Sequence, residues 1–258
     1  MTRWATRSAA PLTGRPTRRW TKRWSGSCAK PTTRAAALSD ADAGAAHAGA
    51  ARAGAADGQS LLDTGLSSAA LSSSGLPPEE RRLAAEARAG LRDGSLVLAK
   101  DAGPHHVTAS CLLLSRIDEE SGEPDSGRRF IALGLHLRSG QWRQFGGHIE
   151  AADTSLRAAA MRELREEAGV DAASDQVRLS PAPLAVRTFS VGSAACASHL
   201  DVLYAASAPH SHPLVTTDAG IGDVAWWPVD KLPQGTAEDL RTDLRALLQR
   251  TETDARTS

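Results

Sequence analysis

The stretch GGHIEAADTSLRAAAMRELREEAGV, residues 146–170, places two glycines shortly before a helix that carries several carboxylates. Glu163, Glu166 and Glu167 are spaced i, i+3 and i+4, so a helix brings them to one face, where like charges repel. A divalent cation would relieve that repulsion. Ligands that are all oxygen suit Mg²⁺, which binds one or two carboxylates together with substrate phosphates. The stretch therefore predicts a cation site and chemistry on phosphates.

The same stretch resembles the signature of the Nudix hydrolases, G-x5-E-x7-R-E-U-x-E-E-x-G-U, in which U is an aliphatic residue. Residues Arg162–Val170 match the second half of this signature at every specified position. The first half departs from it, because the sixth residue after Gly147 is Asp153 rather than Glu. In addition, eight residues instead of seven separate Asp153 from Arg162. The chain therefore has one residue too many for the signature.

The position of the extra residue matters, because an insertion inside the helix would rotate its acidic face relative to everything before it. Counting back from Arg162 puts the expected acid at Thr154, which together with Asp153 makes a good helix N-cap. We therefore expect the helix to begin near Thr154, the loop 148–153 to absorb the extra residue, and Asp153 to cap the helix. Whether Asp153 also replaces the missing Glu stays open.

The resemblance implies a role for each matching position. Glu166 and Glu167 would ligate Mg²⁺ or Mn²⁺, and Glu163 would be a further ligand or the general base for the attacking water. The carbonyl of Gly146 would complete the inner shell, and the catalytic Arg162 would hold the carboxylates in place. A glycine lets the backbone approach the ion without a Cβ in the way. The cation neutralises diphosphate charge and acidifies bound water, while a carboxylate removes the proton.

Further residues near the signature, or later in the chain, have two interpretations each. Gly147, His148 and Trp142 are the candidates for substrate contact. His148 either touches a phosphate or only fixes the turn, and Trp142 either stacks a nucleobase or serves the core. Asp201 and Asp218 are candidates for a general base outside the signature, against the alternative that they are ordinary acids on a strand and a loop.

The cysteines and the remaining histidines indicate no second site. The chain has three cysteines, an odd number without C-x-x-C spacing, so neither a disulfide framework nor a zinc site is indicated. We expect Cys111 and Cys196 to pack as small apolar groups. We expect His199 to be structural, and His105 and His106, which precede a strand, to have no specific role.

Composition divides the 258 residues into a tail and a domain. Residues 1–34 contain nine Lys or Arg and no acid, and residues 35–75 are mostly Ala, Gly, Ser, Thr and Asp. Neither segment can bury enough apolar surface to offset the entropy lost on ordering. We therefore expect a disordered tail over residues 1–75, one folded domain over 76–250, and a disordered C-terminus over 251–258.

The tail also contains the segment Arg18–Trp24, in which tryptophans alternate with basic residues. This pattern could contact nucleic acid or an anionic membrane surface, or form part of a transit peptide. The alternative is an unstructured extension from a misplaced start codon. No run approaches the roughly eighteen apolar residues of a membrane span, and an apolar secretory signal is missing. We expect a cytoplasmic protein without a membrane partner.

The periodicity from residue 76 onward predicts an α/β protein. Strands interrupted by one central helix and closed by another favour an α/β/α sandwich with a mixed sheet between helices, which is also the fold that the resemblance implies. Gly169 is expected to end the central helix as a left-handed cap. The predicted helices begin near Leu76, near Thr154 and after Thr236, and the predicted strands are Val107–Leu114, Phe130–Leu137, Gln141–Phe145, Leu184–Val191, His199–Ala205 and Val224–Trp227.

The leading hypothesis is a Mg²⁺-dependent hydrolase that cleaves the pyrophosphate bond of a nucleoside diphosphate linked to another group. The alternative is a Nudix-like protein that binds a nucleotide or regulates a partner without catalysis. A nucleic-acid-binding protein driven by the basic tail is not expected, because it leaves the acidic helix unexplained. The partner is then a nucleotide or another diphosphate-containing small molecule, and a homodimer is compatible with the resemblance.

Overall fold

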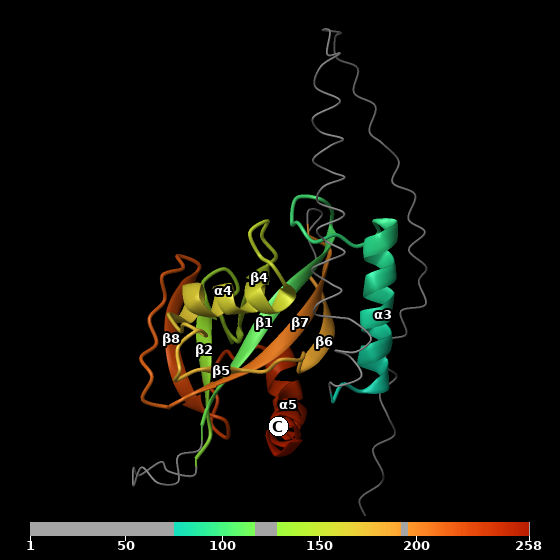
Figure 1. Ribbon diagram of the computed structural model, residues 1–258. Coiled ribbons are helices and arrows are strands. Elements are labelled where there is room, and N and C mark those ends of the chain that lie inside the picture. Colours follow the sequence, from blue (N-terminus) through green and yellow to red (C-terminus); the bar gives the residue numbers. More distant parts are fainter. Residues whose placement is uncertain (1–74, 117–127, 192–195, 258) are drawn as a thin grey trace, which may run out of the picture. The chain divides into compact units, whose positions relative to one another are not determined.

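The computed structural model describes residues 75–116, 128–191 and 196–257. Residues 1–74 of the expected tail, with the segment Arg18–Trp24, lie outside the described residues. The elements are α3 (Pro78–Asp93), β1 (His105–Ser115), β2 (Phe130–His136), β3 (Gln141–Arg143), β4 (Phe145–His148), α4 (Leu156–Ala168), β5 (Arg178–Leu179), β6 (Ala185–Ser190), β7 (Ser198–Ala208), β8 (Ile221–Pro228) and α5 (Glu238–Thr257) (Figure 1).

The strands of the described residues form one eight-stranded sheet. Its main path runs β3-β2-β1-β7-β5, with β4 paired to β1, β6 to β7 and β8 to β2. Strands β1 and β7 are parallel along their full length, from the pair His105 and Ser198 to the pair Ser115 and Ala208. The other strand pairs are antiparallel. The predicted mixed sheet is therefore confirmed.

Alternation along β1 sends its side chains into two separate cores. Leu113 packs in a core that includes Leu164 of α4, whereas its neighbour Leu112 packs in a core that includes Leu244 of α5. Successive side chains on a strand point to opposite faces of the sheet, so α4 and α5 cover opposite faces. The predicted α/β/α sandwich is confirmed, and the acidic helix lies on one defined side of the sheet (Figure 1).

Helix α4 begins at Leu156, two residues later than predicted. Ser155 is its N-cap: the backbone there is extended, and the hydroxyl accepts the N–H of Ala158 at 3.0 Å. The expectation that Asp153 caps this helix is wrong. The extra residue nevertheless lies outside the helix, in the irregular segment 149–155. At the other end Gly169 adopts the predicted left-handed conformation, with φ of 69°, and donates its N–H to Arg165.

Other features also differ from the sequence-based expectations. The predicted strand Gln141–Phe145 is divided into β3 and β4, and β4 continues through the glycine pair to His148. Strand β1 begins at His105, two residues before the predicted Val107. The two-residue strand β5 was not predicted, because a pair of residues has no periodicity to detect. Helix α5 spans Glu238–Thr257. Among the helices that the structure describes, none has both the length and the apolar character needed to cross a bilayer.

Candidate functional site

Strand β4 brings two glycines against strand β1 and helix α4. Gly146 lies opposite Ser110 and Gly147 lies opposite Ala109 in the antiparallel pairing. Gly146 has φ of 154°, and a Cβ at this position would collide with the side chain and backbone of Ser110. A Cβ on Gly147 would collide with the carboxylate of Glu163. The glycine pair therefore lets a carboxylate of the helix lie directly against the strand backbone.

The guanidinium group of Arg162 forms hydrogen bonds to three carboxylates and to the glycine strand, and lies 3.6 Å from a fourth carboxylate, that of Glu150. Its Nη1 lies 2.9 Å from an oxygen of Glu163 and 2.9 Å from an oxygen of Glu166. Its Nε and Nη2 each lie 3.1 Å from an oxygen of Asp153, and Nη2 also donates to the carbonyl of His148 at 2.8 Å. Burial acts to lower the pKa of Arg162, but the carboxylates of Asp153 and Glu163 outweigh it and raise the pKa above its ordinary value. One arginine thus holds these acids together.

Asp153 has a different role from the predicted helix cap. One of its oxygens accepts the backbone N–H of Glu150 at 2.8 Å, which closes the loop before α4. Its carboxylate, with a side chain only 5% exposed, pairs with Arg162 through both oxygens. A two-point pair with arginine is stronger and more specific than a cap on a backbone amide. Asp153 therefore anchors Arg162 from the position that the signature assigns to its first Glu.

Glu163 and Glu167 are buried carboxylates of like charge. Residue exposure is 8% for Glu163 and 5% for Glu167, and an oxygen of Glu167 accepts the N–H of Gly146 at 2.8 Å. Burial raises the pKa of Glu163 to about 7, against the opposing effect of Arg162. Burial also raises the pKa of Glu167 to about 8, with Glu163 adding to the rise. Glu166, in contrast, is partly exposed at the edge of the group.

Asp218 lies on the loop between β7 and β8, which runs alongside the C-terminal half of α4. The neighbouring Thr217 donates both its N–H and its hydroxyl to the carbonyl of Glu166, at 2.9 and 3.1 Å. The charge of Asp218 contributes to the raised pKa of both Glu163 and Glu167. The structure therefore brings this predicted outside acid close to the carboxylates of the helix.

Asp201, the other predicted outside acid, is held in a separate network. It is 3% exposed on β7 and accepts hydrogen bonds from Thr108 at 3.0 Å and from Ser110 at 2.6 Å. Arg187 donates to it at 3.1 Å. Its oxygens thus already have three donors, which favours a structural role for this carboxylate.

Trp142 lies away from the carboxylates. It packs in the core that contains the α5 residues, with its ring 5.4 Å from that of Trp227 in an edge-on contact. Its backbone N–H donates to the carbonyl of Gly235 at 3.1 Å. Since α4 covers the opposite face of the sheet, the structure supports the core interpretation of Trp142.

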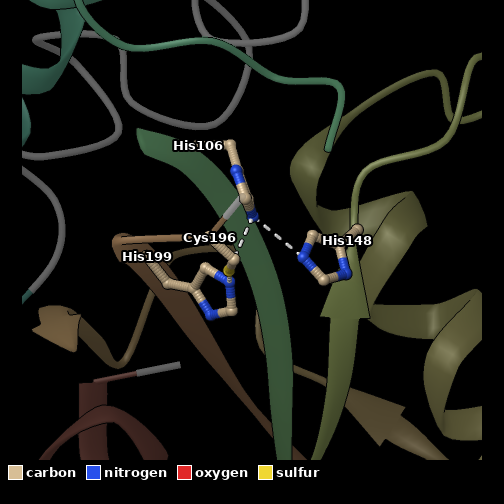
Figure 2. A group of neighbouring side chains, drawn as sticks. All are labelled: His106, His148, Cys196 and His199. Carbon is tan, nitrogen blue, oxygen red and sulfur yellow. Dashed lines mark hydrogen bonds between the residues drawn. The ribbon is translucent and has the colours of Figure 1, made fainter. Parts of the chain in front are cut away.

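His148 divides its contacts between two groups. Its carbonyl holds Arg162, whereas its ring turns toward His106, Cys196 and His199 (Figure 2). Burial lowers the pKa of His148 to about 4, helped by the charges of His199 and His106, and burial together with His106 lowers the pKa of His199 to about 4. Both rings are therefore neutral at pH 7. The sequence analysis did not predict this His/Cys group. The one local signal for it is the C-x2-H spacing of Cys196 and His199.

The donors beside the glycine pair fit a hard divalent cation. Glu163, Glu166, Glu167 and the carbonyl of Gly146 are all oxygen donors, the chemistry that Mg²⁺ prefers. The raised pKa values of the two buried glutamates show that negative charge at this place is poorly compensated by the protein alone. A bound divalent cation would supply the missing positive charge.

The chain is similar to known proteins of one family. The family model of the NUDIX domain matches residues 117–250, about half of the chain. Similar solved structures include a NUDIX-family hydrolase from Clostridium perfringens, with 20% identity over 57% of this chain and 93% of that chain and a TM-score of 0.41. The NUDIX domain of Shewanella oneidensis NrtR, complexed with ADP ribose, has 18% identity over 58% and 87%, with a TM-score of 0.40. An Ap4A hydrolase from C. elegans has 12% identity over 59% and 98%, with a TM-score of 0.43. No curated protein matches the sequence.

Proposed function

The chain belongs to the Nudix family of hydrolases, and from this we propose that it is a Mg²⁺-dependent enzyme that cleaves the pyrophosphate bond of a nucleoside diphosphate linked to another group. The observation that carries the proposal is the pair of buried carboxylates, Glu163 and Glu167, which lie beside Gly146 and Gly147 and are tied into the fold by Arg162. Water would attack one phosphorus and release two phosphate-containing products.

Glu163, Glu166, Glu167 and the carbonyl of Gly146 would hold the cation. When bound, Mg²⁺ or Mn²⁺ neutralises diphosphate charge and acidifies water. Glu163 is also the candidate general base, because it lies against the glycine pair and Arg162 directs its carboxylate. Arg162 fixes the direction of Glu163 and Glu166.

Asp218 is a second candidate for the base. It approaches the carboxylates from a different segment of the chain, as its influence on the pKa of Glu163 and Glu167 indicates. Some Nudix enzymes take the base from outside the signature, so the two acids are alternatives for one role. Comparing Glu163→Gln with Asp218→Asn separates the two candidates. Turnover of the wild type should fall at low pH, where the base is protonated, and only the variant that lacks the base should lose this pH dependence.

The alternative of a non-catalytic nucleotide-binding protein is less well supported. It rests on the altered first half of the signature, in which Asp153 replaces Glu. Asp153 nevertheless pairs with Arg162 through both oxygens, so the altered half still supports the carboxylate group. A protein that only binds a nucleotide has no need to bury two carboxylates of raised pKa next to each other.

A panel of substrates tests the proposed activity. Purified protein with Mg²⁺ is incubated with deoxynucleoside triphosphates, ADP-ribose, dinucleoside polyphosphates and nucleotide sugars, and the products are followed by ³¹P NMR. We expect at least one class to be split into two phosphate-containing products, with the reaction stopped by EDTA and restored by Mg²⁺. Nucleotide binding without turnover of any class would favour the non-catalytic alternative.

A further inference from the structure

We propose that His106, His148, Cys196 and His199 form a second metal site, which takes Zn²⁺ through three imidazoles and one thiolate. The four side chains converge on one point at the end of the sheet (Figure 2). Their ligand atoms, one from each residue, all lie within 4.8 Å of one another. The site is chemically unlike the carboxylate group, because imidazole and thiolate favour zinc whereas oxygen ligands favour magnesium.

The register of the sheet places the three histidines side by side. His106 on β1 lies opposite His199 on the parallel strand β7, so their side chains share one face. His148 on β4 lies opposite Thr108, which is two residues from His106 and so points to the same face. Cys196 comes just before β7 and reaches back to the rings. Three strands thus place the histidines, and of the four ligands only Cys196 and His199 are close together in the sequence.

The distances are close to those of a tetrahedral zinc site. The Nε2 atoms of His106 and His148 are 2.9 Å apart, and the Sγ of Cys196 lies 3.5 Å from His106 Nε2 and 2.8 Å from His199 Nε2. With Zn–N bonds of about 2.0–2.1 Å and a Zn–S bond of about 2.3 Å, tetrahedral ligand atoms are separated by roughly 3.4–3.6 Å. Small side-chain movements would therefore admit the ion.

His106 is already oriented as a ligand. It is fully buried, and its Nδ1 lies 3.1 Å from the carbonyl of Gly103. A carbonyl can only accept, so Nδ1 carries the proton and Nε2 presents its lone pair to the group. Histidines that bind metals usually hold their second nitrogen in this way. The other three residues are half-buried, which leaves the site within reach of an incoming ion.

The site would also stabilise the segment that carries the proposed active site. The ring of His148 faces the His/Cys group while its carbonyl holds Arg162 at 2.8 Å. The same residue directly follows Gly146 and Gly147. A zinc ion with four protein ligands leaves no open position, which is typical of a structural rather than a catalytic site. The expected role of the ion is to tie β4 to the neighbouring strands β1 and β7.

Cobalt substitution tests the site on the whole protein. Metal-free full-length protein is titrated with Co²⁺ in excess Mg²⁺, and Zn²⁺ affinity is measured by competition with a chromogenic chelator. We expect one equivalent of Co²⁺ to give a thiolate-to-cobalt charge-transfer band with the strong visible bands of tetrahedral cobalt, and Zn²⁺ to displace it. Binding of Zn²⁺ should also raise the melting temperature, because an ion that binds only the folded state stabilises it.

Two variants and two controls locate the ligands. Cys196→Ser should abolish the charge-transfer band, and His199→Gln should change the visible bands. Each variant should weaken Zn²⁺ binding by at least about 100-fold, which is more than the loss of a residue that only supports a ligand costs. Cys111→Ala, at a cysteine buried in the core, and Glu167→Gln should both keep the band. Wild-type protein that gives no thiolate band, or a band that persists in Cys196→Ser, would overturn the proposal. The wild-type spectrum decides the matter even if a variant fails to fold.

Discussion

Glu163→Gln and Glu167→Gln should each lower kcat by at least about 100-fold while the protein stays folded. Each substitution removes a carboxylate that is proposed to bind the cation or to take the proton from water, and keeps the size of the side chain. Burial raises the pKa of both groups, which means that the folded state disfavours their charged forms. A neutral amide in place of either carboxylate removes that unfavourable charge. The melting temperature of the metal-free variants should therefore equal or exceed that of the wild type.

Steady-state kinetics with Mg²⁺ and thermal unfolding without metal give the two measurements. Glu238→Gln, at an exposed position in the first turn of α5, is the matched control and should leave kcat unchanged and cost less than about 1 kcal/mol of stability. If both site variants kept kcat within a factor of about three of the wild type, the carboxylates would have no catalytic part. A large loss of stability in either variant would also contradict the burial argument.

Arg162→Ala should destabilise the metal-free protein by about 3–5 kcal/mol, because removal of one partner from a buried ion pair leaves the other charges uncompensated. The side chain of Arg162 is 12% exposed and contacts Asp153, Glu163 and Glu166. Arg165→Ala, at an exposed position of the same helix, is the control and should cost less than about 1 kcal/mol. Urea denaturation at pH 8.5 measures both.

The loss in Arg162→Ala should depend on pH in a defined direction. Burial raises the pKa of Glu163 to about 7 against the opposing effect of Arg162, so this group is mostly protonated at pH 6 and mostly charged at pH 8.5. The stability that accompanies the raised pKa is fully present below the ordinary value of 4.5 and is lost as the pH rises through about 7. Charged Glu163 depends on Arg162 more than protonated Glu163 does, so the variant should lose less stability at pH 6 than at pH 8.5. An equal loss at both pH values would show that Arg162 does not act through Glu163.

The acidic helix could be predicted because its signal is local. The spacing of Glu163, Glu166 and Glu167 specifies one helical face, and Gly169 specifies the end of the helix. The start was misplaced because Asp153 has two competing partners, the backbone at the helix start and a guanidinium nine residues away. The stronger two-point pair with the guanidinium prevails, and Ser155, two residues further on, caps the helix instead.

The His/Cys group could not be predicted from the sequence, because its members are brought together by long-range strand pairing. His106 and His148 are 42 residues apart, and His106 and Cys196 are 90 residues apart. Their approach requires β1 to lie between β4 and β7 with a particular register, and a shift of one residue would send each ring to the other face. Nothing in the local pattern around His106 specifies that register.

Mn²⁺ binding, followed by electron paramagnetic resonance, reports on the carboxylate site itself. One equivalent of Zn²⁺ is added first to fill the His/Cys group. We expect one Mn²⁺ to bind, with an affinity that rises at least about tenfold between pH 6 and pH 8.5, because the ion must displace the protons held by Glu163 and Glu167. The double variant Glu166→Gln/Glu167→Gln should lose this binding. Mn²⁺ affinity that is unchanged in the double variant, or independent of pH, would contradict the assignment of these carboxylates as the divalent-cation site.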